Sequence, residues 1–193
     1  METRRFFEIK DIETRSDSDD NLHLRGRFAV YNSDYEVWPG ATESIAPGAF
    51  RNTLNGDIRA LYNHNDDIVL GRTSAGTLSV EDRSDGLWGD IIVNRKDSDA
   101  MNAYERVARG DVTGCSMGFV IKSQEEEFRD DGTIHWTITE IDPLFEISLC
   151  TFPAYEATHV EARGKDVDAV NRRKLEFRKK EILKRLKGET NGN

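Results

Sequence analysis

The sequence has no long hydrophobic run, and it contains only two cysteines and four prolines. A membrane-spanning helix needs about 18 or more consecutive apolar residues, and no stretch approaches that length. The N-terminal segment Met1–Arg5 also lacks the apolar run of a signal peptide. We therefore expect an intracellular protein without a membrane partner, in which Cys115 and Cys150 are buried free thiols rather than a disulfide.

Metal-binding patterns are also missing. Neither cysteine belongs to a cluster of metal ligands, and no CxxC or HExxH motif occurs. The polar group Asn63, Asn65, Asp66 and Asp67 is crowded onto neighbouring positions and lacks the ligand spacing of a calcium loop. We expect neither a metal nor a cofactor.

Positive charge is scarce over most of the chain. Residues 1–162 contain 16 Lys and Arg against 31 Asp and Glu, whereas residues 163–187 contain 11 against 4. An acidic surface repels a polyanion, so nucleic acid is not expected as a ligand. A length of 193 residues fits one domain of ordinary size with an appendage. We expect a domain over 1–162 and a basic helix and tail over 163–193.

The pattern of short strands separated by turns predicts a mainly β protein with some helix. Strands are expected over 6–12, 22–30, 57–67, 68–73, 76–81, 86–93, 113–121, 133–139 and 145–152. Residues 31–43 read as a turn-rich connection. Helices are expected over 44–56, 98–109 and 166–186.

The stretch Thr113–Ile121 is an apolar strand with one uncommitted polar side chain, Ser116, between Gly114 and Gly118. Successive side chains of a strand point to opposite faces, so Ser116 and Gly118 lie opposite the apolar face. A hydroxyl beside residues without side chains leaves room for another backbone to approach, as an acyl-transfer nucleophile requires. A buried serine in a strand with glycines at bulges is the structural alternative.

A serine nucleophile needs a base, and the base needs a third group that holds it. His64 stands at the end of a strand, and Glu146 lies on the polar face of a very apolar strand. These two residues and Ser116 are candidates for one site. Periodicity alone does not select them over His159 or Asp142.

The other histidines are interpreted as structural. His23 lies on the charged face of the strand over 22–30, and we expect it to be exposed. His135 lies within a hairpin, far in sequence from Ser116, and we expect no chemical role for it.

Several motifs resemble one family in the same order along the chain. The segments are Pro47–Phe50, Asn63–His64, Leu70–Arg72, Ser116–Phe119 and Glu146–Ala157. They closely resemble the prohead maturation proteases of tailed bacteriophages, whose pattern has a Ser-x-Gly-Phe strand and then Glu-Val-Ser-Leu-Val-Thr-Phe-Pro-Ala-Asn. The resemblance covers about residues 6–162.

The resemblance implies an assemblin-like fold, shared with the herpesvirus assembly proteases: a mostly antiparallel β-barrel surrounded by helices. It implies a serine endopeptidase with the triad Ser116, His64 and Glu146. Backbone N–H groups near Ser116 or in the loop after Phe152 are candidate oxyanion donors. Tyr155 departs from the family, which commonly has Asn there.

The resemblance also implies partners and a place of action. The substrates would be the scaffolding region of the major capsid protein and the protease itself, inside the procapsid in the host cytoplasm. The basic tail fits either a docking element for an acidic scaffold or a region of self-cleavage, and a solvated surface helix is the simpler reading. Confinement in a shell would also favour a homodimer.

Two other functions compete with proteolysis. The first is a non-enzymatic assembly chaperone or scaffold-binding protein in which Ser116 and His64 are structural. The second is an esterase-like hydrolase, because Gly114–Gly118 formally matches Gly-x-Ser-x-Gly. That motif requires a strand, a turn and then a helix, whereas here a helix precedes the motif and a strand continues through it.

Overall fold

The computed structural model describes residues 3–7, 12–18, 20–152 and 164–186. This part of the chain is mainly β-structure. Its strands are β1 (Thr3–Phe7), β2 (Ile12–Ser16), β3 (Leu22–Val30), β4 (Tyr35–Trp38), β5 (Ala41–Ile45), β6 (Arg59–Tyr62), β7 (Asn65–Arg72), β8 (Leu78–Arg83), β9 (Gly86–Ile92), β10 (Gly114–Phe128) and β11 (Ile134–Cys150). Its helices are η1 (Thr73–Ala75), α1 (Ser98–Ala108) and α3 (Gly164–Leu186). No helix within these ranges is both long and apolar enough to cross a membrane.

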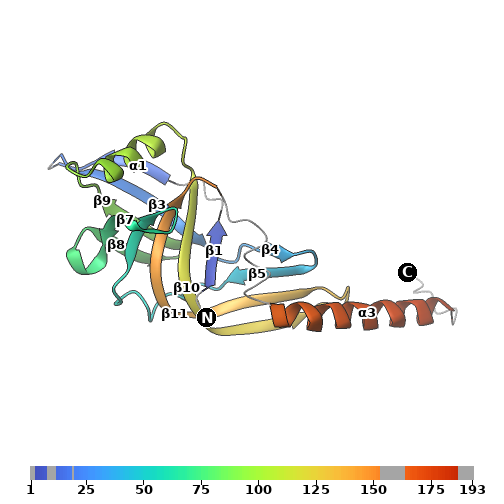
Figure 1. Ribbon diagram of the computed structural model, residues 1–193. Coiled ribbons are helices and arrows are strands. Elements are labelled where there is room, and N and C mark those ends of the chain that lie inside the picture. Colours follow the sequence, from blue (N-terminus) through green and yellow to red (C-terminus); the bar gives the residue numbers. More distant parts are fainter. Residues whose placement is uncertain (1–2, 8–11, 19, 153–163, 187–193) are drawn as a thin grey trace.

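The strands form two sheets (Figure 1). The larger sheet follows the order β1-β10-β11-β5-β4, with β6 also paired to β11 and β7 paired to β6. The smaller sheet follows the order β2-β3-β9-β8. β10 and β11 form a long antiparallel hairpin, whereas β5 and β6 both pair with β11 in parallel. β11 is therefore the central strand of the larger sheet, because it pairs with β10, β5 and β6.

The hydrophobic core lies between the two sheets. Phe28 and Ile91 from the smaller sheet, and Met117 and Ile147 from the larger sheet, are each at most 1% exposed and belong to one cluster. A β-carbon added to Gly89 would lie 2.6 Å from Ile147 Cδ1, which shows how closely the sheets approach. α1 packs against β2, β3 and β7. The two sheets and α1 thus form one packed body.

Local sequence signals account for several elements. The strand predicted over 22–30 is confirmed as β3, with Leu24 and Phe28 buried. The helix predicted over 98–109 is confirmed as α1, and its N-cap is Asp97. The Asp97 side chain accepts hydrogen bonds from the N–H groups of Asp99 and Ala100, which have no partner within the helix.

The helix predicted over 44–56 is wrong. β5 runs through Ile45, and a series of turns follows it, with bonds such as that from the N–H of Ala49 to the carbonyl of Ala46 at 3.2 Å. Gly48 has a φ of +82°, which a right-handed helix does not accommodate. Phe50 is fully buried, so tertiary packing decides the conformation of this segment.

Two further expectations are corrected. The region over 31–43 is not a simple connection, because it contains β4 and most of β5, which pair with each other. His23 is not exposed, because only 7% of its surface is accessible. Its Nδ1 lies 2.6 Å from Asp90 Oδ1 and its Nε2 lies 3.2 Å from Asp17 Oδ2. A buried imidazole needs such partners, and the sequence pattern alone does not reveal them.

The strand pairing of the described residues gives two sheets rather than one closed barrel. The larger sheet is also mixed, because β11 is parallel to two of its neighbours. The fold is therefore mainly β with helices, as the sequence indicates at the coarser level.

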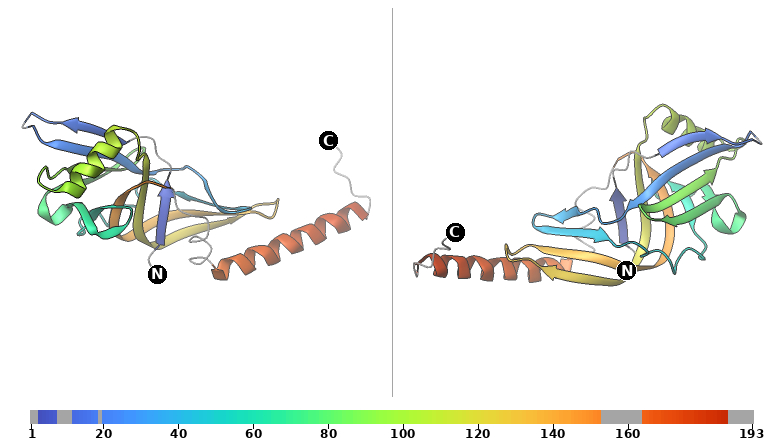
Figure 2. Two further views of the ribbon diagram at one scale, coloured as in Figure 1. Left: turned by 45° about the horizontal axis from the view of Figure 1, so that its top comes forward. Right: turned by 180° about the vertical axis from the view of Figure 1, so that it is seen from behind.

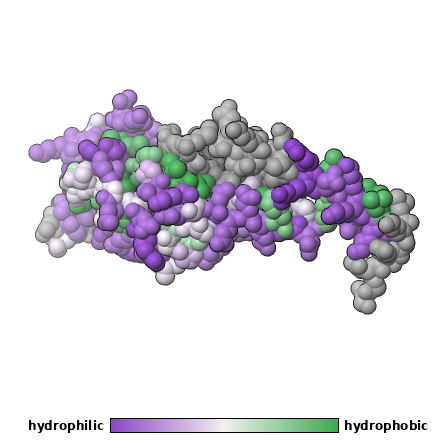
Figure 3. Space-filling view, turned by 90° about the horizontal axis from the view of Figure 1, so that it is seen from below, coloured by the Kyte–Doolittle hydropathy of each residue, from purple (hydrophilic) through white to green (hydrophobic). Residues whose placement is uncertain are grey.

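α3 extends away from the packed body (Figure 2). Midway along α3, Lys174 Nζ donates to the carbonyl of Pro39 at 2.6 Å, and the Arg173 guanidinium lies 3.4 Å from the centroid of the Phe128 ring. Farther along, Ile182 and Leu183 are 57% and 55% exposed. In Figure 3, green patches of hydrophobic residues lie on α3 as well as on the packed body. The helix predicted over 166–186 is confirmed.

Candidate active site

β10 and β11 place three polar side chains on one face of the larger sheet. In the antiparallel register, Ser116 is directly opposite Ser148, and Gly118 is directly opposite Glu146. Directly opposite residues point to the same face, so the Ser116, Ser148 and Glu146 side chains share it. Ser116 and Ser148 are fully buried, and Glu146 is 5% exposed. The opposite face carries the apolar side chains of the core.

His64 reaches this face from a tight turn between β6 and β7. Tyr62 pairs with Asn65, which leaves Asn63 and His64 as the two turn residues. Their φ values are 52° and 57°, as the preferred two-residue hairpin turn requires at both positions. Asparagine tolerates this conformation better than most residues, which explains its place in the turn.

The Asn63 side chain fastens this turn to the end of β11. Its Oδ1 accepts a hydrogen bond from the N–H of Thr151 at 2.9 Å, and its Nδ2 donates to Thr151 Oγ1 at 3.2 Å. The N–H of Asn63 also donates to the carbonyl of Leu149 at 2.9 Å. These bonds fix the position of the turn against β11, and therefore the backbone position of the next residue, His64.

The structure brings His64 and Glu146 together. His64 Nδ1 lies 2.7 Å from Glu146 Oε1, and the side chains are 8% and 6% exposed. The second carboxylate oxygen, Oε2, accepts a hydrogen bond from Ser148 Oγ at 2.6 Å. With Nδ1–H donated to the carboxylate, the lone pair of the neutral imidazole is on Nε2. Such an imidazole has the tautomer of a general base.

Cys150 lies on the Nε2 side of the imidazole. Its Sγ is 3.8 Å from His64 Nε2, and burial together with the Glu146 charge raises the pKa of its thiol to about 12. The thiol is therefore neutral at neutral pH. Cys115, by contrast, belongs to the hydrophobic core, and both cysteines are free and buried as expected.

The other sequence candidates lie elsewhere or outside the described residues. Asp142 is partly exposed, and its carboxylate lies 3.2 Å from Lys122 Nζ. His159, Tyr155 and the loop after Phe152 fall outside the part of the chain that the structure describes.

A serine–histidine contact occurs between β5 and β11. Ser44 Oγ lies 2.9 Å from His135 Nε2, and Thr42 Oγ1 lies 2.8 Å from His135 Nδ1. An Asp34 carboxylate oxygen lies 3.8 Å from His135 Nδ1, beyond hydrogen-bonding distance. His135 is thus held by two hydroxyls, which agrees with a structural role.

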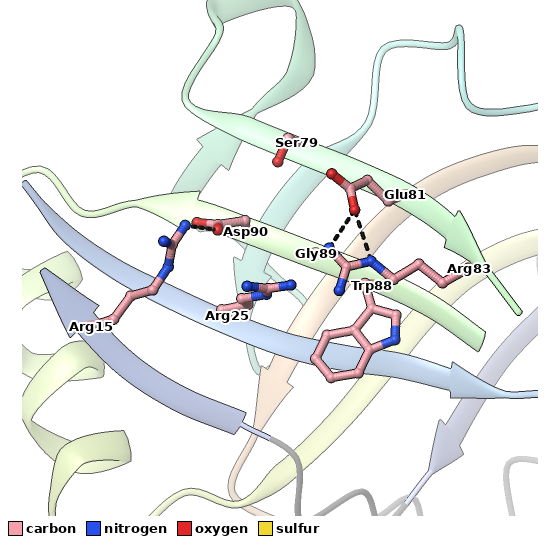
Figure 4. A pocket seen from close by; sticks show the side chains of 8 residues that line it. All are labelled: Arg15, Arg25, Ser79, Glu81, Arg83, Trp88, Gly89 and Asp90. Atoms are coloured by element: carbon pink, nitrogen blue, oxygen red, sulfur yellow. Dashed lines mark hydrogen bonds and ion pairs between the residues drawn. The ribbon is translucent and has the colours of Figure 1, made fainter. Parts of the chain in front are cut away.

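A polar pocket lies on the smaller sheet, away from His64 (Figure 4). Its lining residues are Arg15, Arg25, Ser79, Glu81, Arg83, Trp88, Gly89 and Asp90. Ion pairs join Arg15 to Asp90 and Arg83 to Glu81. The pocket has neither a histidine nor a cysteine in its lining, so it lacks the base that acyl transfer requires. In the described ranges, no three His, Cys, Asp or Glu side chains are arranged to hold a metal ion.

Sequence reasoning missed the contacts of Ser148 and Cys150. Alternation along β11 places both on the Glu146 face, and this signal was available in the sequence. It could not show that the Ser148 hydroxyl bonds to Glu146 Oε2, because alternation gives the face but not the hydrogen bond. It also could not show that Cys150 adjoins His64, because that contact depends on how β6 pairs with β11.

Three comparisons with known proteins show what this chain is similar to. The family model described as caudovirus prohead serine protease matches residues 10–173. The prohead protease of enterobacteria phage HK97 is 29% identical over 150 residues, which are 76% of this chain and 63% of that protein. The chain thus spans less than two thirds of that relative's length. The structure of the bacteriophage T4 capsid assembly protease aligns with a TM-score of 0.47 and 10% identity, covering 79% of this chain and 99% of that one.

Proposed function

Since the chain belongs to the caudovirus prohead serine proteases, we propose that it is a serine endopeptidase with Ser116 as nucleophile, His64 as general base and Glu146 as the group that orients His64. The observation that carries this proposal is the 2.7 Å contact between His64 Nδ1 and Glu146 Oε1, on the sheet face that also carries Ser116. A histidine held at Nδ1 by a carboxylate is poised to accept a proton at Nε2.

The reaction follows from these roles. His64 Nε2 takes the Ser116 hydroxyl proton as Oγ attacks the peptide carbonyl, and the imidazolium is stabilised by Glu146. His64 then gives this proton to the leaving amine, which releases the first product and leaves an acyl-enzyme. Water, activated by the same imidazole, hydrolyses the ester and restores the serine. Because Ser116 is fully buried, attack requires a conformation in which its hydroxyl is uncovered.

The proposed substrates are the scaffolding region of the major capsid protein and the protease itself, processed inside the procapsid. The matched family is described as prohead serine proteases and the HK97 relative is a prohead protease, which supports action in the prohead. A homodimer formed in the confined shell belongs to the same proposal.

We also propose that residues 1–162 are the catalytic domain and that 163–193 dock an acidic scaffold. The support is the excess of positive charge over 163–187, carried in part by a helix that projects from the body. Deletion of residues 164–193 is expected to reduce incorporation of the enzyme into proheads, measured by quantitative mass spectrometry. Unchanged incorporation would exclude the docking role.

At the level of the fold, we propose that the two sheets are a variant of the assemblin barrel. The support is that β3 contacts β10 and β7 contacts β9, so that both sheets enclose one core. A crystal structure in which backbone hydrogen bonds join the strands continuously around this core would support the proposal. Two sheets with no hydrogen bonds between their edge strands would contradict it.

Replacement of the nucleophile tests the proposed function. Ser116→Ala is expected to lower cleavage by roughly 10⁴-fold or more, because no other hydroxyl takes over nucleophilic attack. The readout is mass spectrometry of the capsid protein N-terminus after coexpression with either form. Ser44→Ala is the matched control, since it also removes a buried serine next to a histidine.

A fluorophosphonate probe distinguishes an enzyme from an assembly chaperone. An activated serine reacts with the probe, whereas an unactivated serine does not. Labelling at Ser116 is expected in the wild type and in Ser44→Ala, and not in His64→Ala. Absence of labelling together with unchanged capsid processing in Ser116→Ala would favour the chaperone.

A further inference from the structure

The Glu146 carboxylate has a different partner on each oxygen. Oε1 meets His64 Nδ1 at 2.7 Å, and Oε2 accepts the Ser148 hydroxyl at 2.6 Å. Both distances are in the range of strong, charge-assisted hydrogen bonds. Ser148 is two residues beyond Glu146 on β11, so the alternation of the strand puts the two side chains on one face.

This second contact restricts the carboxylate. The last torsion of a glutamate side chain has broad energy wells, so one hydrogen bond leaves the carboxylate free to turn. Two bonds to opposite oxygens remove this freedom. Ser148 sits on a strand paired on both sides, with β10 at Ser116 and β6 at Leu61, so its hydroxyl is carried by rigid backbone.

Burial makes the contact costly to lose. Ser148 is fully buried and Glu146 is 5% exposed, so little water is available to replace a missing donor at Oε2. A buried carboxylate oxygen without a donor seeks another partner. The movement that satisfies Oε2 would pull Oε1 away from His64.

We propose that Ser148 is a positioning residue that holds Glu146 in the orientation in which it fixes His64. This inference rests on the proposed function and extends it, because it assigns the supporting contact of the triad carboxylate. Ser148 touches neither substrate nor the reacting atoms in this role and acts through Glu146.

The kinetic test compares two buried serines. Ser148→Ala is expected to lower kcat about 10–100-fold with KM nearly unchanged. This is the usual loss when a residue that orients a functional side chain through a hydrogen bond is removed. Ser44→Ala loses a comparable buried bond, to His135 Nε2, and is expected to keep kcat. Ser148→Thr retains the hydroxyl and is expected to recover most of kcat. A Ser148→Ala enzyme with wild-type kcat, or a Thr variant as slow as Ala, would overturn the proposal.

A double-mutant cycle tests the route of the effect. In a Glu146→Gln background, Ser148→Ala is expected to change kcat by less than about 3-fold, because residues that act through one another are not additive. If the two losses multiply, Ser148 acts independently of Glu146 and the proposal is wrong.

A spectroscopic readout separates this inference from the proposed function. The proton between His64 Nδ1 and Glu146 is expected as a downfield ¹H resonance in the wild type and in Ser116→Ala, which is inactive. Ser148→Ala is expected to shift or broaden it, and Ser44→Ala to leave it unchanged. An unchanged resonance in Ser148→Ala refutes the positioning role. Cleavage that does not depend on Ser116 refutes the proposed function instead.

Discussion

At the scale of single residues, the environment of Cys150 decides its chemistry. The thiol lies 3.8 Å from His64 Nε2, a position that in a cysteine protease would suggest a nucleophile. Burial and the Glu146 charge act in the opposite direction, because both disfavour a thiolate and raise the thiol pKa to about 12. The Glu146 carboxylate thus orients the His64 imidazole and, at the same time, disfavours the Cys150 thiolate.

Cys150 is therefore expected to resist alkylation in the folded protein. Iodoacetamide at pH 8 should label neither cysteine until the chain unfolds, as followed by mass spectrometry. The raised pKa also predicts a pH effect on stability. The neutral Cys150 thiol contributes fully to the free energy of unfolding below about pH 8.5, the ordinary thiol pKa. This contribution is lost as the pH rises toward the pKa of the thiol in the folded protein. Rapid native labelling of Cys150 would contradict this account.

At the scale of elements, the β6–β7 turn controls where His64 stands. Asn63→Ala removes both side-chain bonds to Thr151 and places an alanine at a φ of 52°. We expect a loss of about 1–3 kcal/mol in unfolding free energy from the lost bonds and backbone strain. Urea unfolding measures the loss, and peptide cleavage should fall with it because His64 shifts.

Asn63→Gly is the informative companion variant. Glycine accepts the positive φ but makes no bond to Thr151, so its stability should fall between those of the wild type and Asn63→Ala. Equal stability of the two variants would mean that backbone strain at this position is unimportant.

The elements also show where sequence reasoning works and where it stops. Alternation along β3 and β10, and the apolar stripe of α1, are local patterns, and these elements were predictable. The segment over 44–56 has a helix-like composition, yet burial of Phe50 and the positive φ of Gly48 turn it into consecutive turns. The contacts of the His64 turn with β11 arise from long-range pairing, which no local pattern encodes.

At the scale of the whole molecule, the approach of the two sheets at Gly89 is a point of close packing. A β-carbon there would lie 2.6 Å from Ile147 Cδ1 and 2.7 Å from Phe28 Cε2. Gly89→Ala is therefore expected to cost about 1–3 kcal/mol, the usual range for overpacking a core. For a chain of this size, each kcal/mol lowers Tm by roughly 2–4 °C, which calorimetry resolves.

Gly110→Ala provides the contrast for this measurement. Nothing lies within 4 Å of a β-carbon at Gly110, and its φ of +81° is the source of strain. Its expected cost is about 1–2 kcal/mol, without repacking of the core. A Gly89→Ala variant as stable as the wild type would show that the sheets separate more easily than their packing implies.

The central position of β11 has a consequence for when the enzyme becomes able to cut. His64 and Glu146 are 82 positions apart along the chain, and they meet because β6 has docked beside β11. A strand displaced by one residue would present Phe145 and Ile147 where the carboxylate belongs. A nascent chain that has not yet reached β11 would therefore carry Ser116 without the His64–Glu146 pair on which the proposed mechanism depends.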